Sequence, residues 1–121
     1  IKKLINKVKL KNDTIQYSIM SLRQDLILLN TVTDIKTRQQ FKEFINPNKV
    51  YFVYFTATWC KYCKIARPKV IEYLKLLKGK GVNLQFLLLD ADESRDVVRH
   101  LKVKAFPTTL CIMNNQVEDI C

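Results

Sequence analysis

The feature that most limits how this chain can fold is an alternation of apolar runs with helical patterns. Residues 49–58 are rich in β-branched and aromatic residues and carry few charges, which is typical of a strand buried on both faces. Residues 82–90 and 106–113 form two further core-strand runs. Residues 60–78 and 92–102 lie between these runs and place apolar side chains at helical spacing. This alternation predicts an α/β fold, a mixed central sheet flanked by helices.

Shorter segments complete the predicted order. The apolar run at residues 25–31 predicts a strand. Thr33 or Asp34 is a suitable cap for a helix that continues to Ile45. An Asn-Asn turn follows the third core strand and predicts a hairpin whose returning strand covers residues 116–121. The expected order is therefore strand, helix, strand, helix, strand, helix, strand, strand.

The first 24 residues differ from the rest of the chain in their charge and in the spacing of their apolar residues. Their early apolar positions lie three and four residues apart, as on one face of a helix, with lysines between them. We therefore divide the chain into a basic amphipathic N-terminal extension, residues 1–24, and one globular domain, residues 25–121. Three interpretations of the extension stay open: packing on its own domain, contact with a membrane surface or a protein partner, or the remainder of a cleaved targeting peptide.

Charge limits the classes of partner. The net charge is +10, and half of it lies in residues 1–24. Such a balance suits a nucleic acid, an anionic membrane surface or an acidic protein. The chain carries no recognised nucleic-acid-binding motif, so we expect no nucleic acid partner. It also has no run of 18 apolar residues, so we expect no transmembrane helix.

The two ends of the sequence give further expectations. The chain begins with Ile1 rather than Met, which indicates a fragment or a processed form. A sheet of this kind needs helices over both faces, and the final helix is missing from the predicted order. Either the chain continues beyond Cys121, which we favour, or residues 1–24 cover the exposed face. We expect a cytoplasmic protein, or an organellar one if an upstream targeting segment was removed.

Two cysteines stand where the strand at 49–58 meets the following helix. Cys60 lies at or near the helix N-terminus, where free amide groups and the helix dipole favour a thiolate, and Lys61 and Lys64 add positive charge. Cys63 lies about one helical turn later, in a more buried place, near enough to attack a mixed disulfide at Cys60. Attack by Cys60 and resolution by Cys63 is the chemistry that this spacing permits.

A zinc site and a purely structural cysteine pair are the alternatives. A structural zinc site needs four ligands, commonly two Cys-x-x-Cys pairs or one such pair and two histidines. The remaining cysteines, Cys111 and Cys121, lack this spacing, and the single His100 lies on a predicted helix. We therefore expect neither a metal nor any other cofactor. Cys111 lies within a core strand, where we expect it to act as a small buried hydrophobic residue.

These motifs resemble those of the thioredoxin family. The sequence "FTATWCKYCK" (55–64) is similar to the family's active-site strand, tryptophan and Cys-x-x-Cys motif. Pro68 matches the proline that kinks the active-site helix, and "FPTT" (106–109) is similar to the family's loop with a cis proline. The resemblance covers residues 25–121. It implies the thioredoxin fold and a thiol–disulfide oxidoreductase that reduces protein disulfides in cell redox homeostasis.

The resemblance also implies residue roles. Cys60 would be the nucleophile and Cys63 the resolving thiol, and Phe106 backbone groups would pair with an extended substrate like an added strand. The partners would be protein disulfides and a reductase or dithiol donor, and we expect a monomer. The expected substrate surface consists of Trp59, Lys61, Tyr62, Phe106, Pro107 and Thr108.

Several positions depart from the family pattern. Lys61-Tyr62 replaces the Gly-Pro of typical thioredoxins, which leaves the direction of electron flow open. Tyr54 stands where the family has a buried Asp, and Phe86 where it has the paired Lys, so the second step lacks an obvious base. Asn115 replaces the glycine of the last hairpin but can still take a left-handed conformation. An alternative function therefore stays open: a thioredoxin-fold binding module with little redox turnover.

Overall fold

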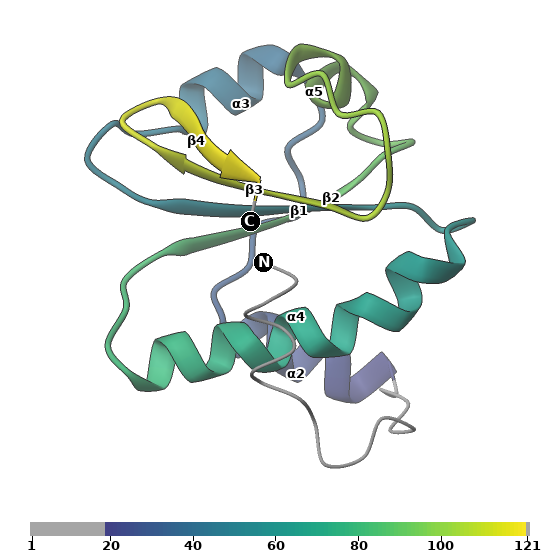
Figure 1. Cartoon of the computed structure of the whole chain (residues 1–121), viewed down its shortest axis with the longest axis vertical. Helices are drawn as coiled ribbons and strands as arrows, with labels where there is room; N and C mark the ends of the chain where they lie inside the picture. Colours follow the sequence, from purple (N-terminus) through teal and green to yellow (C-terminus); the bar gives the residue numbers. More distant parts are fainter. Residues whose placement is uncertain (1–18, 121) are drawn as a thin grey trace.

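The computed structural model describes residues 19–120, which form a four-stranded sheet between two layers of helices (Figure 1). The strand order is β2-β1-β3-β4; β1 pairs with β2 in parallel and with β3 antiparallel, and β3 pairs with β4 antiparallel. The mixed α/β sheet that the sequence predicts is thus confirmed. The strands are β1 (Tyr51–Thr56), β2 (Gln85–Asp90), β3 (Thr108–Met113) and β4 (Gln116–Ile120).

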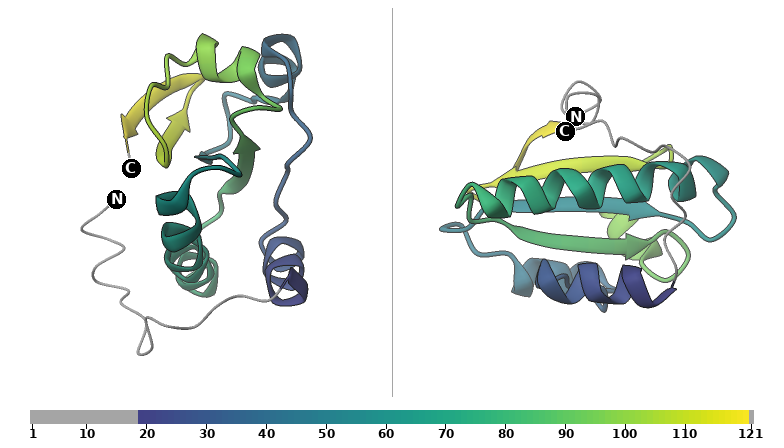
Figure 2. Two further views of the ribbon diagram at one scale, coloured as in Figure 1. Left: turned by 90° about the vertical axis from the view of Figure 1, so that its right-hand side faces the viewer. Right: turned by 90° about the horizontal axis from the view of Figure 1, so that it is seen from below.

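Helices cover both faces of the sheet. Helices α2 (Ile19–Leu28) and α4 (Lys61–Gly79) lie on one face, and α3 (Arg38–Phe44) and α5 (Arg95–His100) lie on the other, as the perpendicular views show (Figure 2). Each layer buries its own apolar cluster against the sheet. Within the part of the chain that the structure describes, no helix is both long enough and apolar enough to span a bilayer.

Strand β1 separates the two clusters. All six of its residues are buried, which confirms the sequence prediction of a strand covered on both faces. Tyr51, Val53 and Phe55 belong to the cluster under α3 and α5, whereas Phe52 and Tyr54 belong to the cluster under α4. This division follows from the two-residue period of a strand, which turns successive side chains to opposite faces.

The predicted strand at residues 25–31 is wrong, because these residues continue helix α2 and then turn. Leu22, Leu26 and Leu29 are four and three residues apart, so they form one helical stripe that packs on the α4 side of the sheet. Asp25 lies on this helix and forms an ion pair with Lys75 of α4 at 2.5 Å. Strand-like pairing begins only after this segment, as one isolated bridge from Val32 to Leu87 of β2.

The next helix also begins later than Thr33 or Asp34. Thr37 caps α3: the backbone N–H of Gln40 donates to its hydroxyl oxygen, and the Gln40 side chain accepts from the backbone N–H of Thr37. This reciprocal capping box satisfies two amide groups that a helix start leaves free. Ile35, which precedes the cap, is buried in the core instead of starting the helix.

The last two strands form the predicted hairpin. Asn114 and Asn115 connect them with φ angles of 53° and 61°, the left-handed conformation that a tight two-residue hairpin turn requires. Asparagine tolerates this conformation better than most residues, so Asn115 replaces a glycine without preventing the turn. Residues 1–18 and 121 lie outside the described residues, and the division into residues 1–24 and 25–121 stays a prediction.

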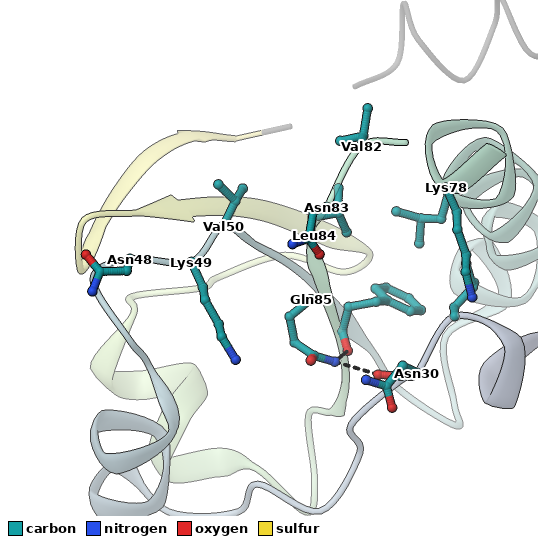
Figure 3. A pocket seen from close by; sticks show the side chains of 12 residues that line it. Asn30, Asn48, Lys49, Val50, Lys78, Val82, Asn83, Leu84 and Gln85 are labelled. Carbon is teal, nitrogen blue, oxygen red and sulfur yellow. Dashed lines mark hydrogen bonds between the residues drawn. The ribbon is translucent and has the colours of Figure 1, made fainter. Parts of the chain in front are cut away.

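The larger of the pockets described, about 390 Å³, lies at the amino-terminal ends of β1 and β2 (Figure 3). Its lining includes Asn30, Lys78 and Gln85, and the Gln85 side-chain amide donates to the Asn30 carbonyl oxygen at 2.5 Å. Cys60 follows the carboxyl end of β1. The pocket and the cysteine pair therefore lie at opposite ends of the parallel strands.

Replacing Leu74 with Ala should lower the free energy of unfolding by about 3 kcal/mol, because a buried leucine loses both apolar contacts and filled volume. Leu74 is 2% exposed on the sheet-facing side of α4. Leu76 of the same helix is 43% exposed, so Leu76→Ala is the matched control and should cost less than about 1 kcal/mol. Urea unfolding measures both; equal losses would contradict the described packing of α4.

Candidate active site

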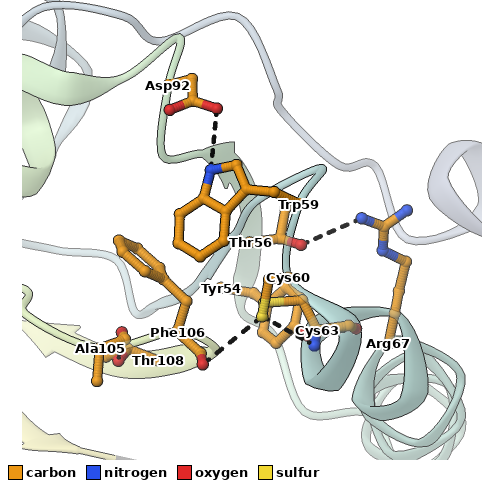
Figure 4. The surroundings of a disulfide bond; sticks show 10 residues. All are labelled: Tyr54, Thr56, Trp59, Cys60, Cys63, Arg67, Asp92, Ala105, Phe106 and Thr108. Carbon is orange, nitrogen blue, oxygen red and sulfur yellow. Dashed lines mark hydrogen bonds between the residues drawn. A yellow bond between two sulfur atoms is a disulfide. The ribbon is translucent and has the colours of Figure 1, made fainter.

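Cys60 and Cys63 lie between the carboxyl end of β1 and the first turn of α4 (Figure 4). Their Cα atoms are 5.3 Å apart and a disulfide joins them. Cys60 is the N-cap of α4, and the backbone N–H of Cys63 donates to its Sγ at 3.2 Å. Cys60 is 6% exposed and Cys63 is 0% exposed, so Cys60 is the member of the pair that a partner can reach.

The loop before β3 lies against this cysteine pair. The Phe106 carbonyl oxygen lies 3.7 Å from Cys60 Sγ, although the two residues are 46 positions apart. The peptide bond between Phe106 and Pro107 is cis, and the Thr108 hydroxyl donates to the Ala105 carbonyl oxygen at 2.5 Å. Pairing of β1 with β3 brings this loop to the carboxyl end of β1, beside the cysteines.

Trp59 forms an exposed wall next to Cys60. Its side chain is 65% exposed, and its ring meets that of Phe106 edge to face, with centroids 5.9 Å apart. The indole N–H donates to Asp92 Oδ2 at 3.2 Å. Asp92 was not predicted as a site residue. Its sequence position did carry a signal, because Asp92 follows β2, and β2 is parallel to β1, so the two strands end at the same edge of the sheet.

Four of the expected substrate-site residues thus lie beside Cys60, and the other two lie on the exposed first turn of α4. Trp59, Phe106, Pro107 and Thr108 surround Cys60 or belong to the loop beside it. Lys61 and Tyr62 occupy the first turn of α4 and point outward, and Tyr62 is 72% exposed.

Tyr54 occupies the layer between β1 and α4, beneath the cysteines. Its side chain is 1% exposed, and its hydroxyl donates to the Cys63 carbonyl oxygen at 3.0 Å. Burial raises the pKa of Tyr54 to about 12, against a smaller opposite effect of the Arg67 charge. The phenol therefore stays protonated at neutral pH and acts as a hydrogen-bond donor. Phe86 fills the same apolar cluster and packs on Phe52, with ring centroids 5.9 Å apart.

Arg67 is a second residue that the sequence analysis missed. It lies on α4, four residues after Cys63, and is half-buried. One terminal guanidinium nitrogen donates to Thr56 Oγ1 at 3.2 Å. Its sequence spacing could have indicated this. Four residues is about one helical turn, so a cation at this position shares a helix face with Cys63.

The described part of the chain offers no cluster of metal ligands. Among residues 19–120, no three His, Cys, Asp or Glu side chains gather in a way that could hold a metal ion. His100 lies on α5 and packs its ring against Phe41, on the face of the sheet opposite α4. Cys111 is half-buried and packs against the cluster under α4.

Comparison with known proteins points to one family. The family model described as "Thioredoxin" matches residues 32–120. The chain is 34% identical over 85 residues to "Thioredoxin-1" of Saccharomyces cerevisiae, a match that covers 70% of this chain and 79% of that protein. It is 36% identical over 76 residues to "Protein disulfide-isomerase 1" of Caenorhabditis elegans, which covers 63% of this chain and 16% of that protein.

A solved structure has the same architecture. Oxidised mitochondrial thioredoxin 3 from Saccharomyces cerevisiae superposes with a TM-score of 0.63 at 26% identity, covering 76% of this chain and 82% of that one. The chain spans 16%, 50% and 62% of the length of three curated relatives that it matches.

The raised pKa of Tyr54 predicts a loss of stability at high pH. The unfolded phenol ionises near its ordinary value of 10.0 and the folded one near 12, so between these values the unfolded state releases the proton first. Between about pH 9 and pH 11, this difference should remove about 1 kcal/mol of unfolding free energy.

The measurement is urea unfolding of wild type and Tyr54→Phe at these two pH values. The variant should lose about 1 kcal/mol less than wild type over the interval. Tyr62→Phe removes an exposed phenol and should keep the wild-type loss. An identical pH dependence of wild type and Tyr54→Phe would contradict the assignment.

Proposed function

Because the chain belongs to the thioredoxin family, we propose that it is a thiol–disulfide oxidoreductase that reduces disulfide bonds in other proteins. One observation carries the proposal: the more exposed cysteine of the pair lies at a helix N-terminus and forms a disulfide with a fully buried cysteine one turn later. A helix start favours a thiolate, which is the attacking species in thiol–disulfide exchange.

The first step is attack on the substrate. The Cys60 thiolate attacks one sulfur of a protein disulfide, a mixed disulfide forms, and the other substrate sulfur leaves with the electron pair and takes a proton from solvent. The backbone N–H of Cys63 stabilises the attacking thiolate, since it donates to Cys60 Sγ. The exposed Lys61 and Lys64 add positive charge at the same helix end.

The second step releases the product. The Cys63 thiolate attacks Cys60 Sγ, the bond from Cys60 to the substrate breaks, and the substrate leaves as a thiol after taking a proton. The disulfide between Cys60 and Cys63 is the oxidised end of this cycle. A reductase or a dithiol donor then supplies two electrons and restores both thiols.

The substrate would lie across the loop before β3. Trp59 and Phe106 form an apolar wall beside Cys60, and Pro107 and Thr108 continue this surface. The backbone of Phe106 is available to pair with an extended substrate segment. Lys61 and Tyr62, exposed on the first turn of α4, would contact the flanks of the substrate.

Replacing each cysteine with serine tests the two steps separately. Cys60→Ser should abolish reduction of insulin disulfides by dithiothreitol-fed protein, because the attacking thiolate is gone. Cys63→Ser should accumulate a stable mixed disulfide with the substrate, because the resolving thiolate is gone. Non-reducing electrophoresis detects that adduct. Full insulin reduction by Cys60→Ser would contradict the assigned roles.

The reduction potential tests the direction of electron flow. A protein that reduces disulfides should have a potential near about −270 mV for the Cys60–Cys63 pair, measured by thiol alkylation and mass counting in graded dithiothreitol buffers. A value of about −180 to −120 mV would instead indicate an oxidase or isomerase. If no disulfide forms between the two cysteines in any buffer, the binding-module interpretation replaces the redox one.

A further inference from the structure

Arg67 is a half-buried cation that the reaction described above does not use. Its terminal nitrogen donates to Thr56 Oγ1 at 3.2 Å, but its Nε is buried and has no hydrogen-bond partner among the described residues. A buried donor without a partner costs about 1–3 kcal/mol. The side chain therefore occupies this place at a cost to stability, and a functional role would account for that cost.

The surroundings of Arg67 connect it to the resolving cysteine through helix α4 and Tyr54. Arg67 and Cys63 are one helical turn apart on α4, and Thr56 ends the strand that carries Tyr54. The Tyr54 hydroxyl contacts the Cys63 carbonyl oxygen and is within reach of the Arg67 charge, which acts on its pKa against the larger effect of burial. The close view shows Arg67 extending from α4, the helix that carries Cys63, toward Thr56 (Figure 4).

Cys63 needs such a charge. It is 0% exposed in a cluster with Ala57, Ala91 and the half-buried Val98 and Phe106. Apolar surroundings disfavour a thiolate because they replace the water that would solvate it. Resolution of the mixed disulfide nevertheless requires Cys63 to act as a thiolate.

The other groups around the cluster offer no evident base. Tyr54 stays protonated at neutral pH, and α5 and the loop before β3 contribute the apolar Val98 and Phe106. The acids at the end of β2 and just after it have other partners: Asp90 Oδ1 accepts the backbone N–H groups of Asp92 and Glu93, and Asp92 Oδ2 accepts the Trp59 indole N–H. The further cations on the first turn of α4, Lys61 and Lys64, are exposed to solvent.

We propose that Arg67 is a positioning residue for the resolving step, whose half-buried charge stabilises the Cys63 thiolate within the mixed disulfide. This inference rests on the proposed oxidoreductase function. Cys63 releases its proton to solvent, its thiolate forms a bond to Cys60 Sγ, and the bond from Cys60 to the substrate breaks. The substrate sulfur leaves with the electron pair and takes up a proton. The positive charge of Arg67 thereby favours the Cys63 thiolate, a role that a base would otherwise fill by accepting the proton.

A single-turnover reaction with dithiobis(nitrobenzoate) separates the two steps. Cys60 attacks the reagent and releases one thionitrobenzoate, and Cys63 releases the second when it resolves the mixed disulfide. Arg67→Met should slow the second release about tenfold at neutral pH and move the midpoint of its pH dependence up by about one unit. The first release should keep its rate. Cys60→Ser and Cys63→Ser proteins assign the two phases.

Two further variants distinguish charge from packing. Arg67→Lys keeps the charge and should restore most of the second rate, whereas Arg67→Gln keeps a polar side chain without charge and should resemble Arg67→Met. Arg67→Gln also makes the comparison if Arg67→Met fails to fold. Lys80→Met removes an exposed cation at the other end of α4 and should change the second rate less than about twofold, because the charge lies far from Cys63 and solvent screens it.

The outcomes separate this inference from the proposed function. A wild-type second rate and pH midpoint in Arg67→Met or Arg67→Gln would overturn the role of Arg67 and leave the oxidoreductase function standing. A wild-type protein that never releases the second thionitrobenzoate would overturn the oxidoreductase function itself. Equal slowing by Arg67→Lys and Arg67→Gln would also overturn the inference, because it would show a role of shape rather than charge.

Discussion

Burial of strand β1 on both faces is the constraint on which the rest of the structure depends. All six of its side chains are buried, and those of residues 51–55 alternate between the cluster under α3 and α5 and the cluster under α4. A strand of this kind must lie inside a sheet and have helices on both sides. Because β1 is central, its carboxyl end lies between β2 and β3, and the segments that follow or precede those strands converge on Cys60.

The layer between β1 and α4 sets the chemistry of the buried cysteine. The family resemblance predicts a buried acid and a buried lysine there, and this chain has Tyr54 and Phe86. Replacing both charges avoids leaving either one buried alone, which would be unfavourable. The Tyr54 hydroxyl donates a hydrogen bond to the Cys63 carbonyl oxygen. The charged Arg67 side chain lies nearby and donates to Thr56.

Much of the fold could be predicted from the sequence, and the errors have physical causes. The three core strands, the helix after Cys60 and the Asn-Asn hairpin all follow from local periodicity and turn chemistry. The run at 25–31 was predicted as a strand because a short apolar run fits a buried strand and a buried helix equally well. Leu22, Leu26 and Leu29 settle the matter only through their contacts with the α4 layer.

The sequence by itself determined the position of the cysteine pair, because a strand, a three-residue link and a helix start are local features. The spacing also placed Cys60 at the helix end and Cys63 one turn inside. Only the tertiary structure decided what surrounds them. The contacts of Cys60 with Phe106 and of Trp59 with Asp92 join segments 46 and 33 residues apart. They depend on the order β2-β1-β3, which no local pattern fixes, since it results from packing all the strands and helices together.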